Sequence, residues 1–489
     1  MTDPASNIST QDMKKLYKAI GSFPKLKSYQ GKRKLDPADQ ANHQLAQDEA
    51  QSLYNHLKRL RYLQDLNYYF PQAAQAVLRD LMNTNKICPK VTKLTIHLHE
   101  FCQLPQAQRS QPPTFFQFGA FPNLKTLKLK SAQTHTLLGP FIAQGLQGLK
   151  SLEKLHLKLS SQCPKLHFIF EALLGLPSQL SAFSISIDCF QDTDWKTFIT
   201  FIRNQKDLVS LKFNIENLNS KNMRLLESNF LEDFLASLSQ KPKLQYLALN
   251  SNYWPLSTLS KGLKRLVNTD QLISFELRAT SNVFSLPKAF SRSPFEGLSE
   301  FLLRNKETLR ELIIDLPSLK EQRFNKEISM AISQLSRLKN FWPSLSTCSL
   351  KECEERSRTV FLNDPMNSKD GHWDPCLDSI LPKLEKLEDL TLDFGMILGG
   401  TPQERKWLSR AFKILPSLSN LRRFEFMVPE SGLTRNEVTI INSVLEGLKH
   451  LNLLNFIDFD GMTDPNTDRI LDRVEKLALR QALRMNYSF

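Results

Sequence analysis

Residues 124–130 read LKTLKLK and residues 152–158 read LEKLHLK, so leucine occupies the first, fourth and sixth places of both stretches. The same spacing returns in LQYLALN at residues 244–250. Each stretch ends in alternating positions, as in Leu127, Lys128, Leu129 and Lys130, and this alternation predicts a short strand with one buried face. The first two stretches begin 28 residues apart. The sequence therefore predicts an internal repeat.

Further copies of this spacing appear when Phe, Ile, Val or Cys is allowed to replace leucine. They lie at Val91/Leu94/Ile96, Leu180/Phe183/Ile185, Leu208/Leu211/Phe213, Leu272/Phe275/Leu277, Leu309/Leu312/Ile314, Leu345/Cys348/Leu350, Leu387/Leu390/Leu392, Leu421/Phe424/Phe426 and Leu451/Leu454/Phe456. Successive copies begin between 28 and 42 residues apart. About twelve repeats with inserted loops are therefore expected between residues 91 and 460.

The intervals between the predicted strands carry apolar residues at helical spacing. Four such groups are Trp195/Phe198/Ile199/Ile202, Leu231/Phe234/Leu235/Leu238, Leu408/Ala411/Phe412/Leu415 and Ile441/Val444/Leu445/Leu448. Each group places its apolar side chains on one face of a helix. A single strand and helix cannot bury this face alone, but stacked copies share one core. The expected fold class is α/β, a curved solenoid with a parallel sheet inside and helices outside.

The repeats resemble the leucine-rich repeats of the ribonuclease-inhibitor-like class, over roughly residues 91–459. After two further residues beyond each frame this family usually places Asn or Cys, and here Asn252 and Cys353 occupy that third place. Because most copies carry another residue there, we expect an irregular arc. The resemblance implies a protein that binds other macromolecules on its inner sheet and carries no cofactor.

The chain ends lack the repeat. Residues 36–90 contain two apolar groups, around Leu57 and Leu78, that predict a helical N-terminal cap. A ubiquitin-ligase adaptor element such as an F-box is the alternative for this region. Residues 461–489, with Ile470, Val474 and Leu477, predict a closing amphipathic helix. Residues 351–376 predict an inserted loop in which Trp373 is a candidate interface anchor.

The net charge of +14 is unevenly distributed. Residues 1–35 are predicted to form a flexible basic arm. Residues 13–35 contain no acidic residue. Its cations are Lys14, Lys15, Lys18, Lys25, Lys27, Lys32, Arg33 and Lys34. Such an arm can bind an acidic protein surface or RNA, and residues 32–34 can bind a nuclear import receptor. A solvated tail that binds nothing is an equal alternative.

Residues on the exposed face of the predicted strands are the candidate binding surface, because solenoids bind their partners on the inner sheet. In the first five units they are mostly basic: Lys93, His97, Lys128, Lys130, Lys154, His156, Lys158 and Lys212. In the later units Glu276, Glu311, Asp315, Asp389, Asp393 and Glu425 outnumber Arg278, Lys351 and Arg423. We therefore expect a face that is basic toward the N-terminus and acidic toward the C-terminus, against the alternative of an ordinary solvated face.

An acidic protein is the preferred partner for the basic part of this face. Proteins that read single-stranded nucleic acid add stacking aromatic side chains to their cations, and Tyr246 is the one aromatic residue at the inner positions considered. The leading hypothesis is a non-enzymatic scaffold within a larger assembly. An RNA-binding ribonucleoprotein component and a substrate-recognition subunit of a ubiquitin ligase remain the alternatives.

Metal and catalytic motifs are weak or missing in the sequence. Residues 464–475 carry oxygen-bearing side chains at the spacing of the calcium ligands in an EF-hand loop. Arg469, however, occupies the position where the turn of that loop needs glycine. The preferred interpretation is therefore that a helix starts at Asp464. Cys348, Cys353, His372 and Cys376 lack zinc-site spacing, and the three cysteines are interpreted as buried thiols. No nucleotide-binding, metalloprotease or serine-hydrolase motif occurs, which predicts no enzymatic activity and no cofactor.

The seven cysteines are odd in number and form no CxxC pair, which favours a reducing compartment. The first ten residues carry neither a basic cluster nor an apolar run, and no long apolar stretch follows. We therefore expect a cytoplasmic protein without a signal peptide or membrane span, with nuclear entry as an alternative.

Overall fold

The fold was analysed in a computed structural model. It describes residues 28–31, 64–69, 90–97, 118–131, 138–159, 165–187, 192–215, 230–251, 256–279 without 268 and 270, 296–315, 327–343 without 329, 381–393, 412–427, parts of 436–457, and 484–488. Residues 1–225 and 226–489 form two compact units, and each is considered by itself. None of the described helices is long and apolar enough to cross a membrane.

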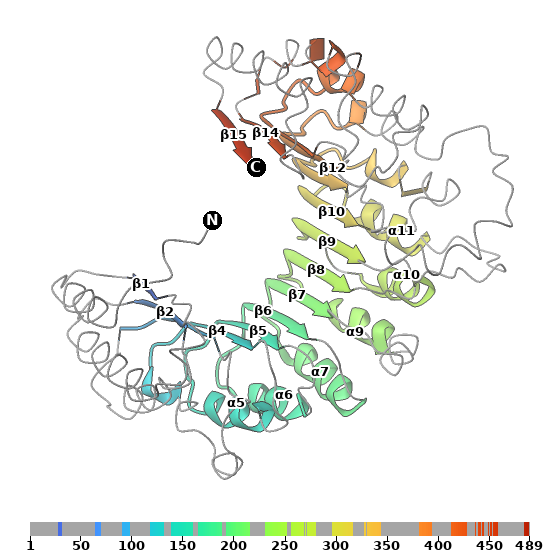
Figure 1. Cartoon of the computed structure of the whole chain (residues 1–489). Helices are drawn as coiled ribbons and strands as arrows, with labels where there is room; N and C mark the ends of the chain where they lie inside the picture. Colours follow the sequence, from blue (N-terminus) through green and yellow to red (C-terminus); the bar gives the residue numbers. More distant parts are fainter. Residues whose placement is uncertain are drawn as a thin grey trace, which may run out of the picture. The chain divides into compact units, whose positions relative to one another are not determined.

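The first unit alternates parallel strands with helices. Its elements are β1 (Ser28–Gly31), β2 (Asp65–Tyr69), β3 (Lys93–His97), the 3-10 helix η6 (Phe118–Ala120), β4 (Thr126–Ser131), α5 (Leu138–Leu146), β5 (Lys154–Leu159), α6 (His167–Leu174), β6 (Ala182–Ile187), α7 (Asp192–Asn204) and β7 (Ser210–Ile215). Each strand pairs in parallel with the next one in sequence. The three α-helices lie on one face of the strands (Figure 1).

The register of the first unit follows from the 28-residue repeat. Leu127 pairs with Leu155, Leu155 with Phe183, and Phe183 with Leu211, so equivalent apolar positions form continuous rows. These side chains are at most 1% exposed. The backbone ladder also reaches one residue before each strand, as in the hydrogen bond of 2.8 Å from Glu153 N to Lys125 O. Shared rows of this kind explain why a single repeat has no core of its own.

Aromatic side chains fill the space between strands and helices in the first unit. The ring of Phe198 on α7 lies 5.1 Å from that of Phe170 on α6 and 5.5 Å from that of Phe213 on β7, measured between centroids. Trp195 lies 5.6 Å from Phe213. All four residues are buried. The apolar spacing in residues 195–202 therefore correctly predicted α7 and its buried face.

A buried carboxylate joins α6 to α7. Asp194 on α7 is fully buried and accepts hydrogen bonds from the backbone N of His167 at 2.8 Å and from its ring Nδ1 at 3.1 Å. His167 is the first residue of α6. Because the first N–H groups of a helix have no partner within the helix, Asp194 satisfies one of them from the neighbouring repeat.

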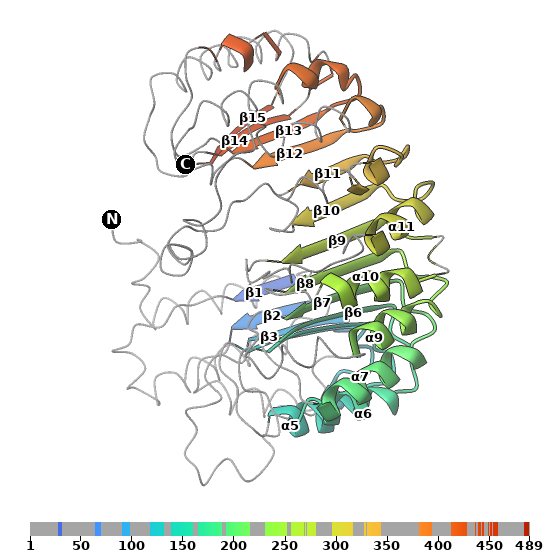
Figure 2. The same ribbon diagram turned by 90° about the vertical axis from the view of Figure 1, so that its right-hand side faces the viewer.

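The second unit follows the same plan. Its elements are α9 (Phe230–Leu238), β8 (Tyr246–Ser251), α10 (Leu256–Arg265), β9 (Ser274–Ala279), α11 (Glu296–Arg304), β10 (Glu311–Asp315), β11 (Asn340–Pro343), the 3-10 helix η8 (Leu381–Lys383), β12 (Asp389–Asp393), the 3-10 helix η9 (Leu415–Ser417), β13 (Arg423–Met427), β14 (Leu453–Ile457) and β15 (Arg484–Ser488). The strands again pair in parallel and in sequence order. Helices α9, α10 and α11 lie in a row beside the strands (Figure 2).

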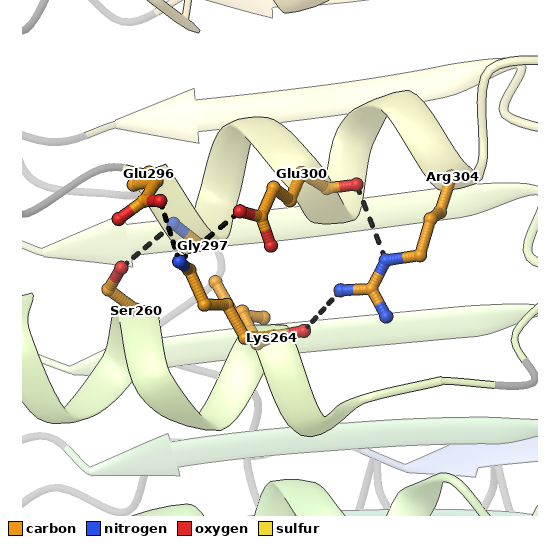
Figure 3. Close-up of polar contacts among 7 residues, drawn as sticks. Ser260, Lys264, Glu296, Gly297, Glu300 and Arg304 are labelled. Atoms are coloured by element: carbon orange, nitrogen blue, oxygen red, sulfur yellow. Dashed lines mark hydrogen bonds and ion pairs between the residues drawn. The ribbon is translucent and has the colours of Figure 1, made fainter.

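Helices α10 and α11 are held together by polar contacts and by a glycine (Figure 3). The amide N of Gly297 donates to Ser260 Oγ at 2.9 Å, and Lys264 Nζ lies 2.9 Å from Glu296 Oε1 and 3.2 Å from Glu300 Oε1. Arg304 donates from Nη1 to Leu266 O and from Nη2 to Leu263 O, both at 2.9 Å. A Cβ on Gly297 would lie 1.9 Å from Ser260 O. Only glycine permits this approach of the two backbones.

One predicted repeat frame is wrong. The sequence placed it at Leu345, Cys348 and Leu350, but the strand is β11, in which Phe341 pairs with Leu312 on one side and Leu390 on the other. The true frame is therefore Leu338, Phe341 and Pro343. Proline at its third place hid this frame, and residues 344–380 lie outside the described part of the chain.

Parallel pairing also begins earlier and ends later than the sequence predicted. Strand β2 lies within the segment expected to be a helical cap, β1 lies within the basic arm, and β15 lies within the segment expected to form the closing helix. The helices predicted in residues 36–90 and 461–489 fall outside the described residues. The α/β class with parallel strands and helices in alternation is confirmed.

Candidate functional site

Strand residues of the first unit alternate between a face covered by helices and an open face. In β4 the side chains of Leu127, Leu129 and Ser131 are buried, while those of Thr126, Lys128 and Lys130 are half-buried or exposed. Strand β5 repeats this pattern. The open face is therefore built from the polar positions of the repeat, as the period of two predicts.

Strand pairing arranges these polar positions in three rows. The rows are Lys93–Thr126–Lys154–Ala182–Ser210, Thr95–Lys128–His156–Ser184–Lys212 and His97–Lys130–Lys158–Ser186–Asn214. Neighbours in a row lie about 4.8 Å apart, and alternate residues on a strand lie about 6.7 Å apart. Residues that are 28 or 33 positions apart in sequence thus become direct neighbours.

The predicted site residues are only partly brought together. Lys128 lies beside His156, with Lys130 diagonal to His156 and Lys154 two residues before it on the same strand. We call Lys128, Lys130, Lys154 and His156 the His156 cluster. Lys158 adjoins it, whereas Ser184 separates Lys212 from His156.

The other predicted positions are placed differently. Lys93 forms an ion pair with Asp65 on β2. The backbone of His97 pairs with that of Lys130, but its side chain is outside the described set. Tyr246 is exposed on β8 and belongs to the second unit. The basic arm residues and Trp373 have no described side chains, so their predicted roles lie outside the described residues.

Electrostatic repulsion marks the His156 cluster. Burial, together with the charges of Lys128, Lys154 and Lys130, lowers the pKa of His156 to about 4. Burial also lowers the pKa of Lys128, and the neighbouring charges of Lys93 and Lys130 act in the same direction. At neutral pH His156 is therefore an uncharged ring surrounded by three ammonium groups.

The lysines of the cluster differ from those at its edge in their partners. Lys125, just before β4, lies 2.8 Å from the carboxylate of Glu153, and Lys93 pairs with Asp65. Among the residues that the structure describes, no ion pair is formed by Lys128, Lys130 or Lys154. Their positive charges therefore face solvent and each other.

On the open face of the second unit, two of the predicted acidic residues have polar or basic neighbours. Glu276 on β9 lies 2.8 Å from Arg278 Nε, and it accepts a hydrogen bond of 2.9 Å from Asn250 Nδ2 on β8. Asp389 on β12 pairs in register with Arg423 on β13. Two of the predicted acidic residues, Glu276 and Asp389, thus have polar or basic neighbours, whereas the side chains of Asp315, Asp393 and Glu425 lie outside the described set.

Sequence reasoning missed two residues of the basic face. Asp65 compensates Lys93, and Thr95 is only 4% exposed although it lies on the open face. The frame Leu63/Leu66/Tyr68, 28 residues before Val91, was the signal that could have found β2 and Asp65.

Comparison with models of known protein families and with curated proteins finds no match for this chain. The physical properties of the open face are therefore the basis for assigning a function.

Proposed function

We propose that this protein is a non-enzymatic scaffold that binds an acidic protein partner on the open face of its first unit, as a subunit of a larger intracellular assembly. We further infer that its repeats are leucine-rich repeats of the ribonuclease-inhibitor-like type. The parallel strands, the intervening helices and the buried leucines in register support this inference. The family likeness still rests on the sequence spacing.

The main support for this proposal is that the lysine charges of the His156 cluster are not paired with a described carboxylate. Three lysines lie on two adjacent strands, where the sheet prevents them from separating, and they form no ion pair with a described residue. Their repulsion makes the free surface electrostatically unfavourable. An acidic partner relieves this repulsion on binding, so complementarity favours such a partner over a neutral one.

Charge reversal tests the proposal. Lys128→Glu, Lys130→Glu and Lys154→Glu would be combined in one variant. A control variant would carry Lys150→Glu, Lys196→Glu and Lys206→Glu, which change the same charge at exposed positions of the first unit away from the open face. Circular dichroism would establish that both variants fold.

Binding of a labelled polyglutamate peptide and of acidic proteins recovered by affinity purification would then be measured. The cluster variant is expected to lose both, the control is expected to retain both, and added salt is expected to weaken binding to the wild type. Unchanged binding by the cluster variant would refute the proposal.

RNA is the main competing ligand. On β4–β7 the described side chains of the open face include no Phe, Tyr or Trp, and His156 is the one ring among them. Proteins that bind single strands add several stacking rings to their cations. Filter binding of RNA with a steep salt dependence, together with no binding of acidic protein, would establish the ribonucleoprotein alternative. The ubiquitin-ligase alternative requires that residues before Val91 capture an adaptor subunit.

A further inference from the structure

The His156 cluster concentrates charge more closely than one carboxylate can neutralise. Lys128 and Lys130 on β4 and Lys154 on β5 surround a single position of the sheet, His156. All three charges act on the ring of His156. Their long, flexible side chains can converge on one ligand group above the ring. The site is therefore matched to a compact group with more than one negative charge.

An extended acidic peptide can match the spacing of Lys128 and Lys130, but it places only one carboxylate at the centre of the cluster. Such a peptide presents carboxylates on one side only at every second residue, about 6.7 Å apart. One carboxylate above His156 would bring one negative charge to three lysines. A phosphomonoester brings a charge of about −1.5 to −2 at neutral pH and three strong acceptor oxygens at a single point.

We propose that the His156 cluster binds a phosphoserine or phosphothreonine of the partner protein. This inference rests on the proposed function, because it specifies the acidic group that the scaffold recognises. Lysine suits phosphate as a point charge, without the fork geometry of arginine. The uncharged ring of His156 adds one N–H donor.

The neighbouring strand leaves room for the phosphorylated residue. On its open face β6 carries Ala182, Ser184 and Ser186, all with short side chains. Ser184 lies in register with His156 and offers a hydroxyl donor. Because the open face of β4–β7 carries no described Phe, Tyr or Trp and His156 is its one ring, a phosphopeptide is favoured over an RNA backbone as the source of the phosphate.

Three labelled peptides of one neutral Gly–Ala–Ser background would test the proposal on the full-length protein. They would carry phosphoserine, glutamate or serine at the centre, and fluorescence anisotropy would report their binding. We expect the phosphoserine peptide to bind about tenfold more tightly than the glutamate peptide, because of its additional charge and acceptors. Inorganic phosphate is expected to compete with it.

A second readout locates the site. NMR of histidine-labelled protein, with the His156 signal assigned from His156→Gln, would follow the titration of this ring. Phosphoserine peptide is expected to raise the pKa of His156 from about 4, because the phosphate neutralises the surrounding lysines. The variant Lys128→Gln/Lys130→Gln/Lys154→Gln is expected to lose phosphate-dependent binding, and Lys150→Gln/Lys196→Gln/Lys206→Gln is expected to retain it.

Each outcome decides between the two proposals. Equal binding of the glutamate and phosphoserine peptides, both dependent on the three lysines, would overturn the phosphate site and leave the acidic-partner function standing. Phosphoserine binding that survives the cluster variant would also overturn the site. Binding of RNA with no binding of either the glutamate or the phosphoserine peptide would overturn both.

Discussion

At the scale of single residues, the pKa of His156 reports the charge that surrounds it on the open face of the first unit. Lys154 belongs to the same strand, but Lys128 and Lys130 come from the preceding repeat and become neighbours only through strand pairing. Together with burial they lower the pKa of His156 from 6.5 to about 4. The ring is therefore a natural reporter of the charge on the open face.

This lowered pKa predicts a pH-dependent stability. Between about pH 6.5 and about pH 4 the unfolded chain binds a proton at His156 that the folded chain does not bind. The free energy of unfolding is therefore expected to fall as the pH decreases through this window. Urea unfolding followed by circular dichroism, at neutral pH and near the lower end of the window, would measure this loss.

The variant His156→Gln is expected to lose less stability over the same window, because its side chain does not titrate. His450→Gln, at an exposed position of the second unit, serves as the control and is expected to behave as the wild type. An identical pH dependence in His156→Gln and the wild type would show that His156 does not cause the effect.

At the scale of elements, helix packing in the second unit depends on the close approach of α10 and α11. The approach brings the backbone of Gly297 against that of Ser260 (Figure 3). It also lets Arg304 reach Leu263 O in the last turn of α10 and Leu266 O just after the helix. Leu263 O also accepts a hydrogen bond of 3.2 Å from Leu266 N, so Arg304 adds to the bonds that close this end of the helix. Arg304 therefore caps α10 from the next repeat.

A methyl group at residue 297 is expected to separate the two helices. Gly297→Ala would place Cβ 1.9 Å from Ser260 O, a backbone atom that cannot rotate away, and should destabilise the unit by about 1–3 kcal/mol. Gly175→Ala is the matched control, since its Cβ would lie 3.5 Å from Ala172 O at a φ of −82°. Urea unfolding should show little change or a small gain for this control.

Replacing Arg304 tests the cap itself. Arg304→Lys keeps the charge but cannot bind Leu263 O and Leu266 O with two fixed N–H groups, so a loss of about 1–3 kcal/mol is expected. Hydrogen exchange of the amides in α10 should rise in this variant. Unaltered exchange there would mean that the two contacts contribute nothing to the helix end.

At the scale of the whole molecule, stability is expected to be distributed along the repeats, because each repeat contacts mainly its neighbours. Phe198 illustrates this arrangement, since its ring contacts residues of α6, α7 and β7 in the first unit. It is fully buried. Damage at this position should therefore spread to adjacent repeats before it reaches distant ones.

The variant Phe198→Ala is expected to destabilise the first unit by about 3–5 kcal/mol through lost contacts and the cavity left behind. Native-state hydrogen exchange should accelerate most in β5, β6 and β7 and least in β12 and β13. Equal acceleration in all of these strands would show that the chain unfolds as one cooperative body and not by neighbouring repeats.

The sequence predicted those parts of the fold in which local periodicity and burial agree. Strands β4 to β8 and helices α7 and α9 were found because their apolar positions keep one spacing and one buried face. Strand β11 was misplaced because Pro343 interrupts the apolar pattern. Strands β1, β2 and β15 were missed because tyrosine, glycine or methionine replaces leucine in their frames.

By itself the sequence determined the repeating strand–helix plan and the polar character of one strand face, because both follow from residue spacing along the chain. Tertiary structure alone decided which charges meet. Pairing in register places Lys128 beside His156 and Asp65 beside Lys93. Pairing thus leaves Lys128, Lys130 and Lys154 without ion pairs to described residues, whereas Lys93 is neutralised by Asp65. The reason is that electrostatic energy depends on distance in space and not on distance in sequence.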